Sequence, residues 1–259
     1  MSRRRVVVTG LGIVSPLGND LASSWDGIVH GRSGIGPVDS FDASAYATRI
    51  AGLVRGFDPT LFVTAKDAKK MDPFIHYGLA ASLMALDDSG LEITEANGER
   101  IGAIIGAGIG GIHGIEEQTI RLHEGGPRKV SPFYIPSTII NMLPGQLSIM
   151  KGIKGPSFSV VSACATSNHS IGVAMRTIQY GDADMMVAGG AELGSSPTSM
   201  AGFCSMKAMS TRNDEPARAS RPWDRERDGF VLGDGAGILI LEEYEHAKAR
   251  GARIYCELA

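Results

Sequence analysis

Short runs of apolar or β-branched residues that end in glycine constrain the fold of this chain most strongly. They lie at 6–10, 101–106 and 185–190. Runs that are apolar at every position are typical of strands buried on both faces of a sheet. Helical patterns separate them, at 66–88, 136–150 and 164–180. This alternation predicts an α/β fold, a mixed sheet with flanking helices.

The last part of the chain adds three more expected elements. The glycine-rich segment 229–241 predicts a hairpin, in which a strand and a second apolar strand flank a tight turn. A charged helix over 242–250 should end before Gly251, with a strand over 253–258 after it. With 43% hydrophobic residues and no obvious linker, all 259 residues are expected to form one domain.

Charge and cysteine content narrow the possible partners. Twenty-five basic and 28 acidic residues give a net charge of -3, so no general attraction to nucleic acid or anionic membrane is expected. No apolar run approaches the length of a membrane span. The three cysteines are far apart and show no Cys-x-x-Cys spacing, which predicts neither disulfides nor a metal site. A reducing cytoplasm is the expected location.

Cys164 is the candidate nucleophile. It falls where a predicted strand over 156–163 meets the predicted helix over 164–180. The free N–H groups and positive dipole end of a helix favour a thiolate there and can donate to an oxyanion. The alternative is an inert buried cysteine. His169 lies five positions along the helix, which turns it roughly 140° away from Cys164 and makes it an ordinary helix-face histidine.

Four stretches resemble a known family. They lie at 5–12, 161–166, 210–214, and 220–224 leading into 227–231. Over essentially its whole length the sequence resembles the type II elongating β-ketoacyl-acyl-carrier-protein synthases. The resemblance implies a thiolase-like layered α/β/α fold, of which residues 1–259 would form the N-terminal half. The second half of that fold would follow Ala259.

The resemblance also implies a reaction of fatty-acid biosynthesis without a cofactor. Cys164 would take an acyl group from a carrier-protein thioester and condense it with decarboxylating malonyl-carrier protein, giving a 3-oxoacyl thioester. The family's two histidines and its lysine lie in His-Gly-Thr-Ser-Thr and Gly-His-Leu-x-Gly-Ala motifs, which these 259 residues do not contain. We therefore expect that this chain does not condense alone.

The resemblance assigns five residues to an acyl and malonyl pocket. They are Ile109, Phe133, Tyr134, Phe203 and Phe230. Phe133 and Tyr134 would be contributed across a homodimer interface, and Phe230 would exclude water from the malonyl carboxylate. Tyr134 stands where phenylalanine is usual, so its hydroxyl needs a partner or a place at the pocket mouth. Without the resemblance, all five could be simple core residues.

The resemblance further implies that a set of basic residues docks an acidic acyl carrier protein. Three of them follow helical i, i+3 and i+4 spacing, which predicts one shared helix face. The full set is Lys66, Lys69, Lys70, Arg128, Lys129 and Lys207. A basic patch on a net-acidic chain speeds encounter with an acidic partner. A solvated surface without a partner is the alternative.

Two other classes of protein fit part of the sequence. Residues 106–111 match G-x-G-x-x-G after a predicted strand, as in dinucleotide-binding oxidoreductases. That class needs an acidic residue about twenty positions on, where this chain has Val130, Ser131 and Pro132. The other class is a non-catalytic partner or scaffold half. Preferential labelling of Cys164 over Cys204 and Cys256 would distinguish an enzyme from it.

Overall fold

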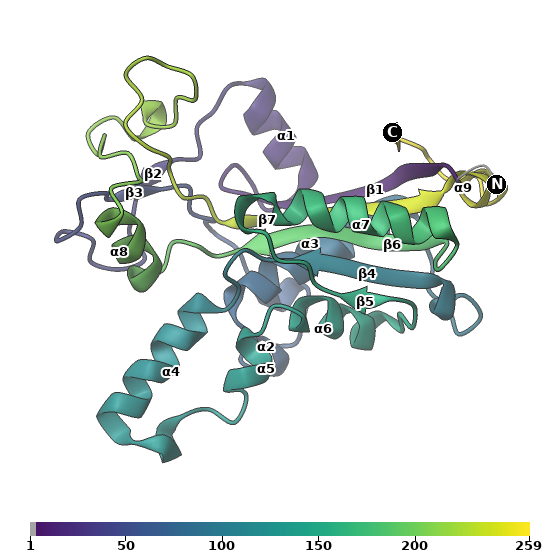
Figure 1. Cartoon of the computed structure of the whole chain (residues 1–259), viewed down its shortest axis with the longest axis horizontal. Coiled ribbons are helices and arrows are strands. Elements are labelled where there is room, and N and C mark those ends of the chain that lie inside the picture. The colour runs from purple at the N-terminus through teal and green to yellow at the C-terminus, as the bar shows by residue number, and fades with distance from the viewer. Residues whose placement is uncertain (1–3) are drawn as a thin grey trace.

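The computed structural model describes residues 4–259 and is built around a mixed sheet (Figure 1). Within that range the sheet has six strands in the order β5-β4-β6-β7-β1-β8. Their bounds are β1 Val6–Val14, β4 Ile101–Gly106, β5 Ser157–Phe158, β6 Met185–Glu192, β7 Gly235–Glu243 and β8 Cys256–Leu258. β4 pairs in parallel with β5 and β6, whereas the β6–β7, β7–β1 and β1–β8 pairs are antiparallel.

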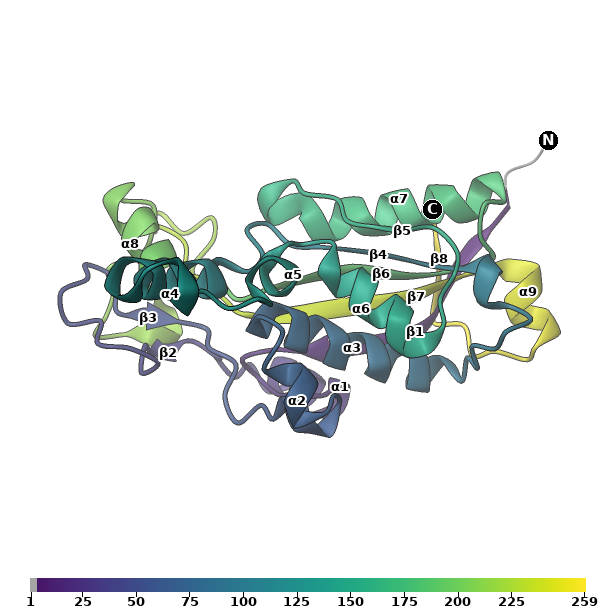
Figure 2. The same ribbon diagram turned by 90° about the horizontal axis from the view of Figure 1, so that it is seen from below.

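Helices cover both faces of this sheet, as Figure 2 shows. Helix α7 (Thr166–Tyr180) lies on one face, and α3 (Pro73–Ser89) with α6 (Met142–Lys151) on the other. The remaining helices are α1 Leu21–Val29, α2 Ala65–Ala68, α4 Ile112–Gly125, α5 Tyr134–Thr138, α8 Pro197–Ser205 and α9 Tyr244–Ala249. Helices α4 and α8 lie at one end of the molecule with a small sheet of β2 (Gly36–Pro37) and β3 (Ile50–Ala51), while α9 lies at the other. The predicted layered α/β architecture is confirmed.

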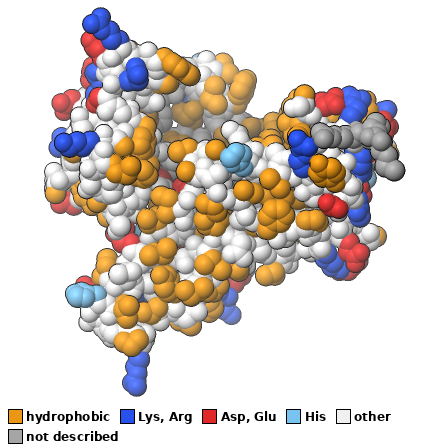
Figure 3. Space-filling model, viewed as in Figure 1, with side chains coloured by type: hydrophobic (Ala, Val, Ile, Leu, Met, Phe, Trp, Pro, Cys, Tyr) orange, Lys and Arg blue, Asp and Glu red, His pale blue; other side chains and the backbone are white. Residues whose placement is uncertain are grey.

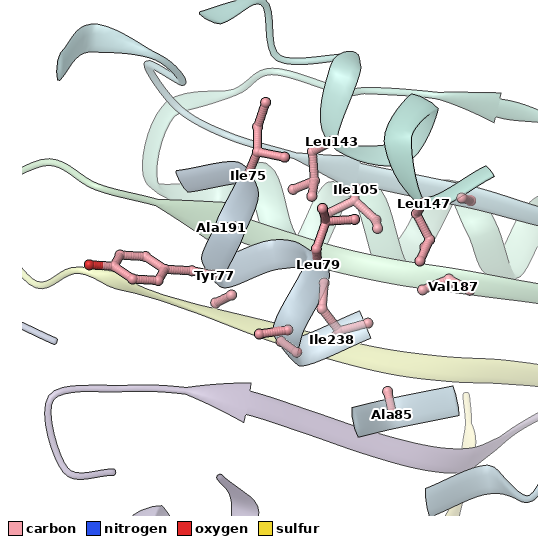
Figure 4. Packing of buried hydrophobic residues seen from close by; sticks show 14 of the residues in the cluster. Ile75, Tyr77, Leu79, Ala85, Ile105, Leu143, Leu147, Val187, Ala191 and Ile238 are labelled. Carbon is pink, nitrogen blue, oxygen red and sulfur yellow. The ribbon is translucent and has the colours of Figure 1, made fainter. Parts of the chain in front are cut away.

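Two hydrophobic clusters explain why the strands are apolar at every position. Ile105 packs with Leu79 of α3 and Leu143 of α6 (Figure 4). Its neighbour Ile104 points to the opposite face and packs with Ile178 of α7. All of these side chains are fully buried. Each such burial contributes about 1.5–3 kcal/mol, so both faces of the central strands stabilise the fold.

Glycine lets α3 lie directly on β1. A Cβ at Gly12 would come within 1.9 Å of the Ala81 carbonyl oxygen, and one at Gly10 within 2.2 Å of the Ala85 carbonyl oxygen. Both oxygens belong to the α3 backbone, which cannot rotate away as a side chain can. The glycines at these two places are therefore required by close backbone packing.

A buried ion cluster fastens the last helix to the sheet. The Glu242 side chain is fully buried. Its Oε1 lies 2.7 Å from Arg250 Nε and 2.7 Å from His246 Nδ1, and its Oε2 accepts hydrogen bonds from Arg250 and from Thr9 Oγ1. Burial alone would raise the pKa of Glu242, but the hydrogen bonds from Arg250, His246 and Thr9 together lower it. Glu242 is therefore held as a carboxylate.

The helix predicted over 66–88 is two helices. It breaks between α2 and α3, where Asp72 accepts a hydrogen bond from Phe74 N and Pro73 occupies the first turn of α3. Proline fits a helix start but interrupts a helix interior, which explains the break. The predicted helix over 136–150 likewise divides into α5 and α6, with extended backbone at Ile139.

The predicted hairpin over 229–241 is wrong in its first strand. Residues 235–243 form β7, whereas Phe230 bridges Met209 and Gly233 bridges Gly52. The backbone of 229–233 finds its hydrogen-bond partners in other segments, so it does not pair with β7. The predicted strand over 156–163 is short, since only Ser157 and Phe158 pair. The charged helix and the strand after Gly251 are confirmed as α9 and β8.

Among the helices of residues 4–259, none has both the length and the apolar character that crossing a membrane requires.

Candidate active site

Cys164 lies in a single 3-10 turn, Ala163–Ala165, that leads directly into α7. The residue is exposed. Ala165, at the N-cap of this fifteen-residue helix, makes no side-chain capping bond to the first turn. Cys164 therefore lies two residues before the positive end of the helix dipole, and the N-cap residue offers no side chain to the free N–H groups there. The predicted junction is only partly confirmed, because Cys164 lies two residues before α7 but the strand β5 already ends at Phe158.

The backbone before Cys164 is strained and braced. Ala163 has φ +52, a left-handed conformation that a residue with a Cβ rarely adopts. Ser162 N donates to Thr166 Oγ1 at 2.8 Å, and Ser162 Oγ lies 2.6 Å from His169 Nδ1. His169 is therefore more than an ordinary helix-face residue, because it holds the segment that presents Cys164. Its spacing from Cys164 gave no sign of this contact, which is made to Ser162 instead.

A cavity of about 620 Å³ opens beside Cys164. Three predicted pocket residues line it together with the cysteine, namely Ile109, Phe203 and Phe230. The Phe203 and Phe230 rings meet edge to face, with centroids 5.3 Å apart. The rest of the lining comes mostly from small residues at the ends of β4, β6 and β7. The volume lies within the usual range of small-molecule sites, so the cavity can take an extended apolar group next to the thiol.

Phe133 and Tyr134 lie outside this cavity in the single chain. They stand at the start of α5, where Phe133 is 44% exposed and Tyr134 is half-buried. Lys70 Nζ lies 5.6 Å from the centre of the Phe133 ring. The structure therefore brings Ile109, Phe203 and Phe230 together with Cys164, but not these two residues.

Two carboxylates that the sequence did not single out border the cavity, the half-buried Glu192 and the buried Asp234. Glu192, the last residue of β6, accepts hydrogen bonds from the backbone N–H groups of Gly108 (2.6 Å), Ile109 (2.9 Å) and Gly110 (2.9 Å). Burial raises the pKa of Glu192, while these three donors act to lower it. A charged residue at the end of an apolar strand was the available signal, but its partners lie more than eighty residues away.

The second carboxylate is Asp234, which precedes β7. It accepts hydrogen bonds from Gly194 N at 2.9 Å and from Ser195 N at 3.1 Å, and a further one from Ser195 Oγ. Burial raises the pKa of Asp234 against the effect of these donors. The carboxylate thereby joins the loop after β6 to the start of β7.

The contacts of Glu192 also argue against a dinucleotide site at residues 106–111. A phosphate in such a loop is held by backbone N–H groups. Here three of those groups already bind Glu192, and Gly111 N donates to the Thr138 carbonyl oxygen at 3.1 Å. The loop binds the chain's own carboxylate in place of a phosphate.

The predicted docking residues come from three separate segments. Lys66 lies in α2, Lys69 caps its C-terminus, and Lys70 follows, so the three do not share one regular helix. Lys70 is half-buried and pairs with Asp67 at 2.7 Å. The other five are exposed, with Arg128 and Lys129 in a 3-10 turn beyond α4 and Lys207 just past α8.

Comparison with known proteins identifies the class to which this fold and this site belong. The family model for the beta-ketoacyl synthase N-terminal domain matches residues 3–247. The chain therefore belongs to the beta-ketoacyl synthase family. It is 62% identical over 258 residues to 3-oxoacyl-[acyl-carrier-protein] synthase 2 of Vibrio harveyi, and 52% identical to the protein of that name from Coxiella burnetii. These matches cover 100% of this chain but 62% of each relative's length.

Solved structures agree with this assignment. A beta-ketoacyl synthase from Burkholderia phymatum superimposes with a TM-score of 0.87 at 34% identity, covering 98% of this chain and 62% of that one. The ishigamide ketosynthase/chain length factor gives 0.89 at 32% identity, covering 99% and 62%. The predicted thiolase-like layered fold, represented by its N-terminal half, is confirmed.

Proposed function

We propose that this chain supplies the nucleophile of a 3-oxoacyl-[acyl-carrier-protein] synthase of fatty-acid biosynthesis. One observation carries the proposal: an exposed Cys164, at the start of α7, opens onto a cavity lined by Ile109, Phe203 and Phe230. The names of the relatives support the same reaction.

The proposed chemistry has two steps. In the first, the Cys164 thiolate attacks the carbonyl of an acyl thioester, a new C–S bond forms, and the carrier thiolate leaves and takes a proton. In the second, malonyl-carrier protein loses CO₂, and the electron pair of the broken C–C bond attacks the acyl-enzyme carbonyl. A C–C bond forms and the Cys164 thiolate is released. The Phe203–Phe230 pair would keep water from the malonyl carboxylate and so favour its decarboxylation.

The two steps can be separated experimentally. No histidine or lysine within residues 4–259 lines the cavity beside Cys164, so the chain lacks a group there to stabilise the carbanion. We expect the purified chain to form an acyl-enzyme with acyl-carrier protein, yet to make no 3-oxoacyl product when malonyl-carrier protein is added. Mass spectrometry of protein and product measures both. Turnover like that of a complete synthase contradicts the second expectation, and no acyl transfer at all would favour the non-catalytic scaffold.

We also propose that an acyl carrier protein docks on the exposed basic residues. Lys66 and Lys69 are exposed near the beginning of α3, and Arg128 and Lys129 at the far end of α4. One solved relative is described as a type II PKS acyl-carrier protein in complex with its ketosynthase. Charges on this kind of surface act mainly by steering an acidic partner.

Reversing two of these charges should weaken docking. Lys66→Glu with Lys69→Glu is expected to raise the Kd for acyl carrier protein about tenfold at low salt, since each exposed charge contact contributes up to about 1 kcal/mol. Titration calorimetry at two salt concentrations measures this. The control is Lys248→Glu, an exposed lysine of α9, which lies at the end of the molecule remote from α4. Equal affinity of the double variant and the control would contradict docking at this place.

We propose that a second copy of the chain packs on an apolar face of the molecule and forms a homodimer. Figure 3 shows hydrophobic side chains spread over the face that carries α5, α6 and β5, with charges gathered mainly at its margins. Exposed members include Phe133, Ile135, Ile149, Phe158 and Val161. Strand β5 also forms an edge of the sheet, and edges pair readily with other chains. Such a homodimer would allow Phe133 and Tyr134 to complete the partner's pocket. The mass in solution, from sedimentation, distinguishes one copy from two.

We infer a cytoplasmic location for this protein. Its three cysteines are free thiols, and Cys164 and Cys256 are exposed. Exposed thiols persist in a reducing compartment and oxidise outside it. The proposed nucleophile requires the reduced state.

A further inference from the structure

Glu192 holds the loop that follows β4. The two strands β4 and β6 run parallel, with Gly106 paired to Gly190, so the end of β6 lies beside the loop after β4. From there the Glu192 carboxylate takes one hydrogen bond on Oε1, from Gly110, and two on Oε2, from Gly108 and Ile109. A Cβ at Gly108 would stand 2.9 Å from Oε2. The loop backbone is thus fitted closely around this carboxylate.

Beyond the contacts of Glu192, Gly111 N donates to the Thr138 carbonyl oxygen at the far end of the loop. Gly108 and Gly110 flank Ile109, and Gly110 adopts φ +78, so the backbone here has access to conformations closed to other residues. Three successive N–H groups that converge on one point form an anion-binding concavity. The Ile109 side chain, 39% exposed, projects from this loop into the wall of the cavity that contains Cys164. The position of the Ile109 side chain therefore depends on the contacts that hold these three N–H groups.

We propose that Glu192 is a positioning residue that sets acyl-chain selectivity, because it clamps Gly108–Gly110 and thereby fixes Ile109 in the wall of the acyl pocket. This rests on the proposed function, in which Cys164 accepts acyl chains. A carboxylate suits the task because both of its oxygens accept. A glutamine in its place would offer one oxygen and turn an NH₂ group toward a backbone donor.

The rate of alkylation of Cys164 measures how well the pocket accepts an alkyl chain, and it does not require the condensation reaction. Iodoacetamide and N-dodecyl iodoacetamide both form a thioether on the sulfur and release iodide, but only the second must place a long chain in the cavity. Ile109→Ala should raise the ratio of the long-probe to the short-probe alkylation rate about tenfold, because a shorter side chain in the wall widens the cavity. Glu192→Gln should raise the ratio about threefold, since the released loop lets Ile109 move.

The double variant separates positioning from a general structural effect. If Glu192 acts through Ile109, adding Glu192→Gln to Ile109→Ala should leave the ratio at the value of Ile109→Ala alone. The control, Glu95→Gln, removes an exposed carboxylate that pairs with Lys154 and should not change the ratio. An unchanged ratio in Glu192→Gln, or effects that simply multiply in the double variant, would overturn the proposal.

A second variant guards against a Glu192→Gln protein that fails to fold. Gly108→Ala displaces the Glu192 side chain sterically without altering the residue itself, and should shift the ratio in the same direction. No shift there would also overturn the proposal. Failure of the proposed function looks different: Cys164 in the unaltered chain would then react no faster with iodoacetamide than Cys204 or Cys256 does.

Discussion

Replacing Cys164 with serine is expected to abolish acyl transfer to the chain. A serine hydroxyl stays protonated at neutral pH and attacks a thioester only when a neighbouring base takes its proton. No histidine lines this cavity in the part of the chain that the structure describes. The mass of the intact protein after incubation with dodecanoyl-carrier protein measures the effect. The unaltered chain should gain one acyl group, and Cys164→Ser none.

The other two cysteines provide matched controls. Cys204 lies in α8 beside the pocket residue Phe203, and Cys256 lies in β8 on the far edge of the sheet. Cys204→Ser and Cys256→Ser should each take up the acyl group as the unaltered chain does. An acyl group that remains on Cys164→Ser, or that disappears with Cys204→Ser, would place the nucleophile elsewhere.

Replacing Arg250 with methionine is expected to cost the fold about 3–5 kcal/mol, because it leaves Glu242 as a buried charge without its main partner. Urea unfolding at pH 7 measures the loss. The control is Arg121→Met, which breaks an exposed pair with Glu117 on α4 and should cost less than about 1 kcal/mol. Equal losses in the two variants would contradict the importance of the buried cluster.

The contribution of Glu242 to the free energy of unfolding should change with pH in opposite directions in the unaltered chain and in Arg250→Met. In the unaltered chain the lowered pKa of Glu242 means that its contribution is present above the unfolded pKa and is lost as the pH falls through the folded value. In Arg250→Met burial dominates and raises the pKa of Glu242, so the protonated form is favoured in the folded state. The deficit of the variant should therefore shrink on acidification, and a deficit independent of pH would contradict this account.

The strands and the place of Cys164 just before a helix could be predicted because their signals are local. Ile104 and Ile105 are apolar neighbours because each faces a different helical layer. Cys164 stands between an extended segment and a helical pattern that are adjacent in the sequence. Pro73 is a helix-start signal that the sequence contains. The helical periodicity on both sides of it nevertheless led to the prediction of a single helix.

The contacts that shape the pocket could not be predicted, because they join distant segments. The Glu192 carboxylate meets N–H groups more than eighty residues earlier in the chain, and Asp234 meets Ser195 thirty-nine residues earlier. The failed hairpin has the same cause, since Phe230 bridges Met209, more than twenty residues earlier, and does not pair with β7. The bracing of Ser162 by His169 depends on a turn whose strained geometry at Ala163 leaves no trace in the sequence.

The backbone contact between β1 and α3 limits which parts of this core can accept amino-acid substitutions during evolution. Where side chains set the distance between a helix and a sheet, a larger residue on one side can be matched by a smaller one opposite. At Gly10 and Gly12 main-chain atoms set that distance, and no compensating exchange is possible. Viable sequence variation in this layer should therefore collect around α6, while the register of α3 on β1 stays fixed.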